Sequence, residues 1–293
     1  MLSFLIDDKK IIDDGMSAVI AAENPEQDTI VSAMRYAALG GKRLRGILVL
    51  EFAKMLGCEI CEALPYALGI ECIQAYSLVH DDLPCMDNDD MRRGKPSNHV
   101  VFGEDIALLA GDALQSLAFD VMTREDTVKI ASADVSAKCV NILANYCGAL
   151  GMVGGQVIDL EHENKKTPIE VITEMHRKKT GALIKAACEM GCVCGRADDE
   201  KILAARSYGE AIGLAFQVVD DILDVTATKE QLGKPIGSDL ENNKSTYVSL
   251  LGIDKCREIV AQQTQIAIDS LSVFENDATA LKNIALKLAN REK

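Results

Sequence analysis

The sequence predicts an all-α fold, and three observations support that prediction. Apolar residues recur at helical spacing over long stretches, as at Ile202, Ala205, Tyr208 and Ile212. Alternating segments rich in Val, Ile and Thr and bounded by turn pairs are absent, so little β structure is expected. Only six prolines interrupt the 293 residues. The pattern therefore predicts a large bundle of roughly ten or more helices.

The composition predicts one folded domain over residues 1–293. The chain is 48% hydrophobic and 26% charged, which supplies a large core and gives no sign of disorder. Turn-forming residues break the helical pattern at several points, and none of these breaks is long enough for a domain linker. The breaks fall at residues 40–41, 58–61, 84–98, 163–168, 195–199 and 233–243.

Charge and residue usage exclude several classes of function. The net charge is −14, with 31 basic against 45 acidic residues, which argues against nucleic acid as a partner. The chain has no long uncharged apolar run and no cleavable signal pattern, so we expect a cytoplasmic protein without stable membrane insertion. The ten cysteines are expected to be buried, reduced thiols, because they are scattered through expected helices. Cys58 and Cys61 have zinc-type spacing, but no histidine pattern completes such a site.

A first cluster of carboxylates follows an expected helix over about residues 64–82. It contains Asp81, Asp82 and Asp87. A continuous helix would splay Asp81 and Asp87 by roughly 240°, but Pro84 lets the chain leave the helix and bring Asp87 back. We therefore predict a helix end followed by a returning loop.

A second cluster of carboxylates ends an expected helix over about residues 200–224. Asp220 and Asp224 are four residues apart, so they share a helix face to within about 40°, with Asp221 one residue round. Gln217 lies on the same stripe. Because clustered carboxylates repel one another unless cations lie between them, the two clusters together predict bound Mg²⁺. The alternative for either cluster alone is a solvated helix end.

Basic residues near these acids predict anionic ligands. The loop after the first cluster carries Arg92 and Arg93, as expected where metal-bound and directly bound phosphates lie side by side. A glycine pair precedes Lys42 and Arg45, whose spacing predicts that both project from one helical face. Other polar residues in apolar or turn surroundings are weaker candidates, since each alone is more often a surface residue. They are Gln156, Lys179, Thr180, Lys234 and Lys244.

These motifs resemble those of the isoprenyl (polyprenyl) diphosphate synthases, the trans-prenyltransferase family. The resemblance is carried, in order, by GGKRLR, DDLPCMDNDDMRRGKPSNH, GGQ, KTG, FQVVDDILD and GKPIGSDLENNKSTY. It spans nearly the whole chain and is greatest to bacterial farnesyl diphosphate synthases. The six-residue spacing of the first acidic motif is like that of bacterial and plant geranylgeranyl diphosphate synthases.

The resemblance implies a single all-α bundle around a deep apolar cavity, usually as a homodimer. It implies that Asp81 and Asp87 ligate two Mg²⁺ ions and Asp220 a third, with Mn²⁺ as the expected substitute. The carboxylates in supporting positions would be Asp82, Asp221 and Asp224.

The resemblance also implies two diphosphate sites. The residues implied to bind the allylic diphosphate are Arg92, Lys179 and Lys234, with Thr180, Gln217 and Lys244 beside them. Gln156 is a further expected substrate-binding residue. Those implied to bind isopentenyl diphosphate are Lys42, Arg45 and Arg93. Gln74 stands where bacterial members commonly carry His, and it can donate to phosphate but cannot become a cation.

The implied reaction is a condensation of isopentenyl diphosphate with dimethylallyl or geranyl diphosphate. Mg²⁺ and the basic side chains would make the allylic diphosphate a leaving group, the isopentenyl double bond would attack the cation, and a proton would be lost. Farnesyl diphosphate is the expected product, because an aromatic residue at the position of Tyr76 usually floors a fifteen-carbon pocket in the family. Helix geometry puts Ser77, rather than Tyr76, beneath Asp81.

Three alternatives remain open at this point. A geranylgeranyl diphosphate synthase would make a longer product. A terpene cyclase would not need a second diphosphate site at Lys42, Arg45 and Arg93. A non-catalytic subunit that tunes a partner synthase would be expected to lack one acidic cluster, and both clusters are intact.

Overall fold

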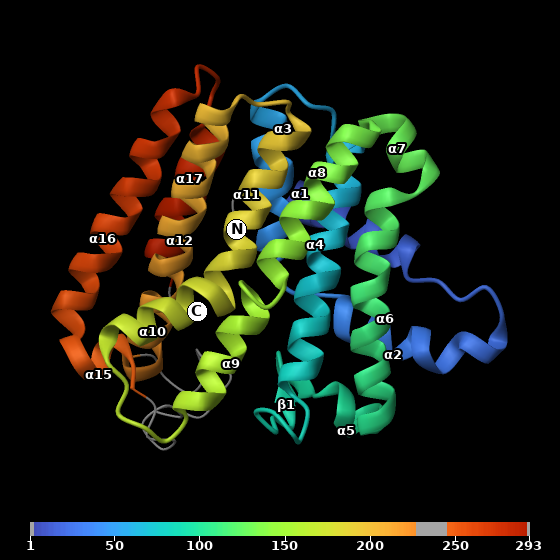
Figure 1. Ribbon diagram of the computed structural model, residues 1–293, viewed down its shortest axis with the longest axis horizontal. Coiled ribbons are helices and arrows are strands. Elements are labelled where there is room, and N and C mark those ends of the chain that lie inside the picture. The colour runs from blue at the N-terminus through green and yellow to red at the C-terminus, as the bar shows by residue number, and fades with distance from the viewer. Residues whose placement is uncertain (1–2, 227–244, 292–293) are drawn as a thin grey trace. The chain divides into compact units, whose positions relative to one another are not determined.

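Helices make up most of the computed structural model, which describes residues 3–226 and 245–291 (Figure 1). More than ten α-helices lie in these residues, so the all-α prediction is confirmed. The β structure of the same residues is one antiparallel hairpin, formed by β1 (Met91–Arg92) and β2 (Lys95–Pro96). The chain divides into two compact units, residues 1–141 and 142–293. A single domain over residues 1–293 stays a prediction.

In the first unit, α4 (Ile60–Asp81) packs against α3 (Leu44–Met55) and α6 (Glu104–Thr123), as Figure 1 shows. Residues 46–53 of α3 are buried on every face of the helix, because that stretch is almost wholly apolar. The helix that ends at Asp81 begins four residues earlier than predicted, where Glu59 and Glu62 form a capping box. The other helices of the unit are α1 (Ser3–Val19), η1 (Pro25–Gln27), α2 (Asp28–Ala38), α5 (Asn98–Phe102) and α7 (Glu125–Ala131).

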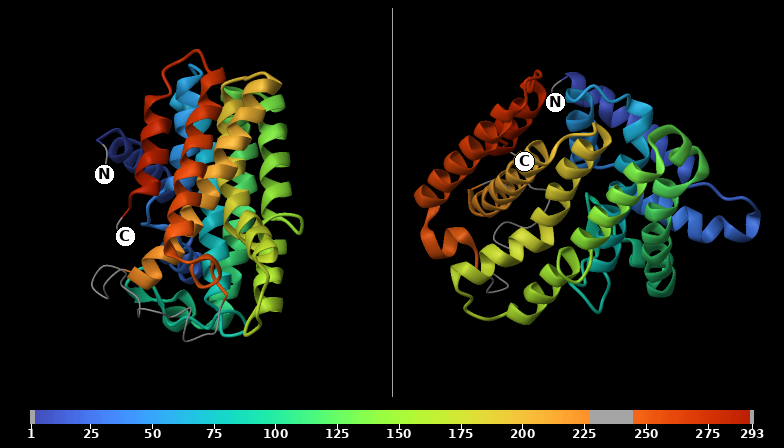
Figure 2. Two further views of the ribbon diagram at one scale, coloured as in Figure 1. Left: turned by 90° about the vertical axis from the view of Figure 1, so that its left-hand side faces the viewer. Right: turned by 45° about the horizontal axis from the view of Figure 1, so that its top comes forward.

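In the second unit, α12 (Asp199–Thr226) packs against α11 (Ala182–Cys194) and α16 (Ile253–Ser270). Figure 2 shows α16 and α17 (Thr279–Ala289), in red, running alongside the orange α12. The remaining elements are α9 (Met152–His162), α10 (Ile169–His176), the π-helical turn η2 (Arg177–Gly181), α15 (Tyr247–Leu251) and η3 (Leu271–Val273). α8 (Ala133–Cys147) crosses the boundary between the units.

A buried apolar cluster fixes the carboxyl-terminal end of α12 in the second unit. Val218 and Val219 of α12 pack with Ile172 of α10, Tyr247 of α15 and Val260 of α16. Burying such side chains stabilises the folded state by about 1.5–3 kcal/mol each. The last turns of α12, which carry the second acidic cluster, are therefore held by three other helices.

All ten cysteines are free thiols, as predicted, but only eight are buried, because Cys61 and Cys85 are exposed. In residues 3–226 and 245–291, no group of three or more His, Cys, Asp and Glu side chains is arranged to hold a metal. In the same residues one helix, α6, is long and apolar enough to span a membrane, and 39% of its most apolar 18-residue stretch is buried. A core helix of a soluble protein meets the same criterion.

Candidate active site

The first acidic cluster is a helix end with a returning loop, as predicted. α4 ends at Asp81, and the backbone N–H of Asp87 donates to the carbonyl of Asp81 at 2.9 Å. The N–H groups of Met86 and Asn88 both donate to the carbonyl of Leu83, at 2.8 and 3.1 Å. The loop thus places the backbone of Asp87 against the last residue of the helix.

Within this cluster, Asp82 is paired with Arg92 of β1. The Nε of Arg92 donates to both carboxylate oxygens of Asp82, at 2.9 and 3.1 Å, and Asp82 is 2% exposed. Burial raises the pKa of Asp82, the Arg92 guanidinium opposes that shift, and Asp89 and Asp87 add to it, so the pKa lies above its usual value. The pair fixes the hairpin to the end of α4.

The donor chemistry of the first cluster fits a hard divalent cation. Oδ1 of Asp87 is buried and has no hydrogen-bond partner. A desolvated carboxylate oxygen is costly unless a cation or a donor reaches it, and carboxylates are the ligands that Mg²⁺ takes in proteins. The predicted ligands Asp81 and Asp87 belong to the first unit and Asp220 to the second. Their meeting at one metal site stays a prediction.

A pocket of about 200 Å³ opens in the first unit between the glycine loop and the hairpin. Gly40, Gly41, Asp82, Arg92 and Arg93 are among the residues that line it. A Cβ on Gly41 would lie 2.8 Å from Cζ of Arg93, and Gly41 has a φ of +91°. The positive φ favours glycine here, and the missing Cβ lets the Arg93 guanidinium lie against the loop. The structure therefore joins two motifs about fifty residues apart in a cationic pocket.

Arg43 changes the predicted geometry of the loop after the glycine pair. Its backbone is left-handed, with φ 55° and ψ 29°, and α3 begins only at Leu44. Lys42 therefore lies before the helix, and the prediction that Lys42 and Arg45 share one helical face is wrong. The reversed backbone at Arg43 interrupts the helical geometry on which that prediction depended.

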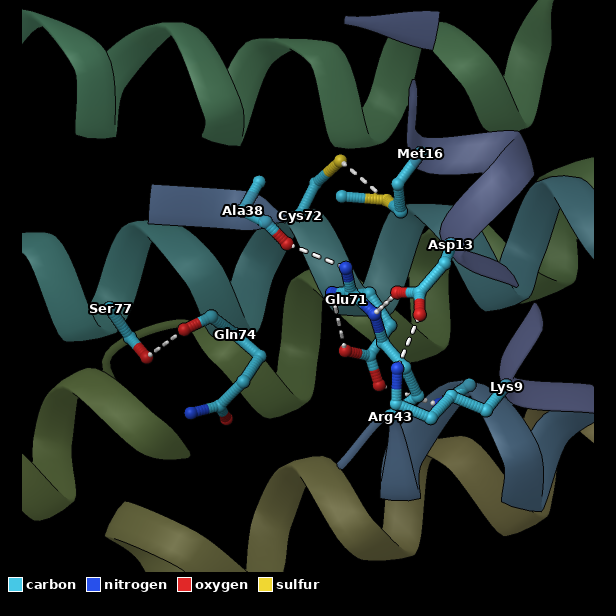
Figure 3. A network of polar contacts seen from close by, with 10 residues as sticks. Lys9, Asp13, Met16, Ala38, Arg43, Glu71, Cys72, Gln74 and Ser77 are labelled. Carbon is cyan, nitrogen blue, oxygen red and sulfur yellow. Dashed lines mark hydrogen bonds and ion pairs between the residues drawn. The ribbon is translucent and has the colours of Figure 1, made fainter. Parts of the chain in front are cut away.

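The side chain of Arg43 turns inward and is fixed from three sides (Figure 3). Its Nε donates to Oδ1 of Asp13 at 2.7 Å and its Nη2 to the carbonyl of Ala38 at 2.7 Å. Its Nη1 lies 3.4 Å from Oε2 of Glu71, whose Oε1 accepts the N–H of Gly46 at 2.9 Å. With 2% of its side chain exposed, Arg43 is a structural cation that fixes the start of α3.

Arg45 and Arg93 hold positive charge close to the same carboxylate, Glu71. The Nε of Arg45 is buried without a hydrogen-bond partner. Burial lowers the pKa of Arg45 to about 10, with Glu71 opposing and Arg93 adding to the shift. Burial likewise lowers the pKa of Arg93. Crowded, desolvated guanidinium groups favour an incoming anion, which supports a diphosphate at Arg45, Arg93 and the exposed Lys42.

The residues that precede the first cluster lie on α4. Ser77 donates its hydroxyl proton to the carbonyl of Gln74 at 3.0 Å. Tyr76 is 6% exposed, and its ring contacts His80 edge to face with centroids 5.7 Å apart. Tyr76 is thus a packed ring five residues before Asp81, and its role as a pocket floor stays a prediction.

In the second acidic cluster, Asp220 is paired with a residue near the end of the chain. Nη2 of Arg291 forms an ion pair with Oδ1 of Asp220. The Arg291 guanidinium lies over the ring of Phe216, 3.8 Å from its centroid. The sequence carried no signal for this contact, because Arg291 belongs to none of the motifs.

The neighbouring Asp221 is buried and accepts a backbone hydrogen bond. It is 7% exposed, and its Oδ2 accepts the N–H of Tyr247 at 2.8 Å. Asp224, one turn further along α12, is partly exposed. Asp220 and Asp221 therefore face different partners, and Tyr247, the last residue of the GKPIGSDLENNKSTY motif, contacts the cluster directly.

The structure brings the GGQ and KTG motifs together in the second unit. Nζ of Lys179 donates to Oδ2 of Asp159 at 2.7 Å. A Cβ on Gly155 would lie 2.2 Å from the backbone N of Lys179, so only glycine allows α9 to pass this close. Thr180 follows in η2, a π-helical turn, and Gln156 follows Gly155 in α9; both are partly exposed. Single π turns inside helices occur frequently at functional sites.

Gln217 has a partner that the sequence did not indicate. Its side chain is hydrogen-bonded to His176, the last residue of α10. Burial lowers the pKa of His176 to about 4; Asp159 and Gln217 oppose the shift, and Lys179 adds to it. His176 is therefore neutral at pH 7 and bonds the Gln217 amide as an uncharged group.

The two remaining predicted residues, Lys234 and Lys244, lie outside the described residues. Four residues that the structure places at or beside the predicted ones had no assigned role: Glu71, His176, Tyr247 and Arg291. The first three lie within or close to the motifs, so their position in the chain could have suggested them, but only tertiary contacts reveal what they hold.

The cationic pocket beside a carboxylate loop is typical of an enzyme that handles diphosphates with divalent metal. The family model described as polyprenyl synthetase matches residues 27–284. The chain therefore belongs to the polyprenyl synthetase family and is a short-chain prenyltransferase of that family.

Its relatives carry two kinds of name. A farnesyl diphosphate synthase from Geobacillus stearothermophilus is 40% identical over 99% of this chain and 97% of its own. A geranylgeranyl diphosphate synthase from Cyanophora paradoxa is 40% identical over 99% of this chain and 96% of its own. The solved structure of an FPP/GFPP synthase from Zymomonas mobilis superposes with a TM-score of 0.86 at 37% identity, over 97% of this chain and 96% of that one.

Proposed function

We propose that the chain condenses isopentenyl diphosphate with dimethylallyl or geranyl diphosphate to give farnesyl diphosphate. The observation that carries this proposal is the pocket of the first unit, where Arg93 lies against Gly41 next to the Asp82–Arg92 pair. A cationic pocket that abuts a carboxylate loop suits one diphosphate bound by side chains beside another bound through metal. A terpene cyclase would have no use for the first of these.

Each part of the chain has a proposed task in the reaction. Asp81, Asp87 and Asp220 would hold Mg²⁺, which when bound neutralises the departing diphosphate as the C–O bond ionises. Lys179, oriented by Asp159, donates to that diphosphate. The other groups proposed at the allylic diphosphate are Arg92, Gln156, Thr180, Gln217, Lys234 and Lys244.

The second substrate is bound directly by basic side chains rather than through metal-binding carboxylates. Lys42, Arg45 and Arg93 bind the diphosphate of isopentenyl diphosphate and orient its double bond toward the allylic cation. Gln74 adds a neutral donor, so its contribution does not depend on pH in the range where histidine titrates. The proton released at the end leaves with the diphosphate, the nearest base that the reaction itself supplies.

The proposal of a fifteen-carbon product rests on Tyr76. Its buried ring on α4, five residues before Asp81, is large enough to limit how far a growing chain extends. Geranylgeranyl diphosphate is the second candidate, favoured by the six-residue spacing from Asp81 to Asp87 and by the names of several relatives. Product length separates the two.

The carboxylate variants Asp87→Asn and Asp90→Asn test the proposal as a matched pair. Asp87 carries the buried, unpartnered oxygen, whereas the side chain of Asp90 is 84% exposed. With isopentenyl and dimethylallyl diphosphate and Mg²⁺, we expect Asp87→Asn to lower kcat by roughly a hundredfold or more and Asp90→Asn by less than about threefold. Equal activity of the two variants would count against Asp87 as part of the metal site.

We also propose that the protein is a cytoplasmic homodimer. Apolar side chains on α5 and α6 are 46–53% exposed, and a second copy would cover them; they are Val100, Val101, Leu108 and Leu109. Sedimentation of the wild type and of Leu108→Glu with Leu109→Glu checks this, because the charged variant should sediment as a monomer. Cell fractionation checks the location.

A further inference from the structure

Tyr247 connects the second acidic cluster to α10 inside the second unit. Its backbone N–H donates to Oδ2 of Asp221 at 2.8 Å. Its ring stacks on His176, with centroids 5.8 Å apart and planes 25° from parallel. The residue is 3% exposed, so it cannot itself offer a surface to a substrate. Tyr247 thus contacts Asp221 through its backbone and His176 through its side chain.

The hydroxyl of Tyr247 is fixed in direction as well as in position. It lies 2.6 Å from Oγ1 of Thr173, which donates its single proton to the carbonyl of Ile169 at 2.7 Å. Thr173 must therefore accept from Tyr247, because a threonine hydroxyl has one proton to give. The chain of bonds runs from Tyr247 through Thr173 to the backbone of α10, and it holds the ring against that helix.

His176 connects Tyr247 to Gln217, a residue of the proposed allylic site. It is hydrogen-bonded to the side chain of Gln217, which lies one turn before Asp220 and Asp221 on α12. It also directly precedes η2, which carries Lys179 and Thr180. Stacking on Tyr247 fixes the plane of the His176 ring, and with it the plane in which the ring meets Gln217.

We propose that Tyr247 is a positioning residue for the allylic diphosphate site, holding Asp221 through its backbone N–H and Gln217 through the stacked ring of His176. The proposal rests on the proposed function, since it assigns Tyr247 to the same site. Tyr247 touches no reacting atom and acts only through its neighbours. Its loss therefore affects one substrate and not the other.

Substitutions of two buried tyrosines separate positioning from packing. Tyr208 is the matched control, because it is also fully buried in the second unit and donates its hydroxyl to a backbone carbonyl, that of Leu281, at 2.7 Å. We expect Tyr247→Leu to lower kcat/KM for geranyl diphosphate by roughly tenfold or more, with KM for isopentenyl diphosphate within about twofold of wild type. Tyr208→Leu should alter the kinetic constants for the two substrates by the same factor or leave both unchanged. The proposal is overturned if the two leucine variants behave alike.

A milder pair decides the matter if Tyr247→Leu does not fold. Tyr247→Phe and Thr173→Val each break the same hydroxyl bond and keep the ring. Both should lower kcat/KM for geranyl diphosphate by roughly threefold, whereas Tyr208→Phe should not. Wild-type kinetics from either Tyr247→Phe or Thr173→Val would contradict the proposed chain of bonds.

A double-mutant cycle tests the route through Gln217. If Tyr247 acts on the allylic site through Gln217, then Tyr247→Leu should cost less than about threefold in a Gln217→Ala background. Additive losses would overturn that route.

A binding readout keeps the test distinct from the proposed function. Mg²⁺ with inorganic diphosphate should raise the melting temperature of wild type and Tyr208→Leu more than that of Tyr247→Leu. Equal shifts contradict the positioning role. Failure of the wild type to make any prenyl diphosphate contradicts the proposed function instead, and leaves this binding comparison to decide the role of Tyr247.

Discussion

Arg291 and Asp220 form an ion pair in which the arginine is buried and the aspartate is not. The side chain of Arg291 is 9% exposed and that of Asp220 is 47% exposed. The guanidinium also donates to the carbonyl of Phe216 at 2.8 Å and lies over its ring. A cation of the chain is thus already at a carboxylate for which we propose Mg²⁺. A divalent ion that binds Asp220 is therefore repelled by the positive charge of Arg291.

Removing this cation should make the protein respond to less Mg²⁺. For Arg291→Gln, we expect the Mg²⁺ concentration at half-maximal activity to fall by roughly two- to fivefold, because like charges at short range repel. At a fixed, subsaturating Mg²⁺ concentration with inorganic diphosphate, the rise in melting temperature should be larger in Arg291→Gln than in wild type. Arg257→Gln is the control, since Arg257 is exposed and lies 3.7 Å from the surface carboxylate of Asp254. An unchanged or higher Mg²⁺ requirement in Arg291→Gln would contradict competition.

A methyl group at Gly41 should damage the isopentenyl site. Its Cβ would lie 2.8 Å from Cζ of Arg93, so Gly41→Ala should displace that guanidinium and raise KM for isopentenyl diphosphate by roughly tenfold, with kcat changed less. Gly40→Ala controls for backbone strain. Gly40 also has a positive φ, +101°, but a Cβ there would meet nothing within 4 Å. The assignment is wrong if both variants raise KM equally.

Truncation of Tyr76 should lengthen the product. Tyr76→Ala removes the large packed ring five residues before Asp81 on α4, and chromatography of the dephosphorylated products should then show prenyl chains beyond fifteen carbons. Ser77→Ala removes only a hydroxyl that donates to the carbonyl of Gln74, so its product should match that of the wild type. An active, folded Tyr76→Ala enzyme with unchanged product length would rule out Tyr76 as the floor.

His176 should make the fold less stable in acid. Burial lowers its pKa from 6.5 to about 4, so the unfolded chain takes up the proton first as the pH falls. The stability that the neutral ring contributes is present in full above about pH 6.5 and is lost between pH 6.5 and 4, by up to about 1.4 kcal/mol per pH unit. Urea unfolding of wild type and His176→Gln at pH 7 and pH 5 measures this. The variant should lose less stability than the wild type, and an equal loss in both would contradict a buried neutral His176.

Spacing and residue type were enough to predict the carboxylate loop. The proline after Asp82 indicated that the helix ends there, and the bond from the N–H of Asp87 to the carbonyl of Asp81 is the local contact that such a turn produces. The two long helices that end in the acidic clusters could be predicted for the same reason. Their apolar periodicity is a local property of the sequence.

Features that depend on a single backbone angle or on distant residues could not be predicted. The left-handed backbone of Arg43 separates Lys42 from α3, and nothing in GGKRLR distinguishes it from a helix start. Glu71 meets Arg43 across 28 residues, Tyr247 meets Asp221 across 26, and Arg291 reaches Phe216 across 75. Periodicity gives no information about such partners, because they are set by how helices pack.

The most direct test of the central proposal is a metal-dependent product assay on the wild-type protein. It is incubated with isopentenyl and dimethylallyl diphosphate, once with Mg²⁺ and once after complete removal of divalent metal, and the products are identified by chain length. We predict a linear fifteen-carbon diphosphate with Mg²⁺, none without metal, and full recovery when Mg²⁺ is restored. Condensation that persists without divalent metal, or no condensation with Mg²⁺ present, would contradict the account.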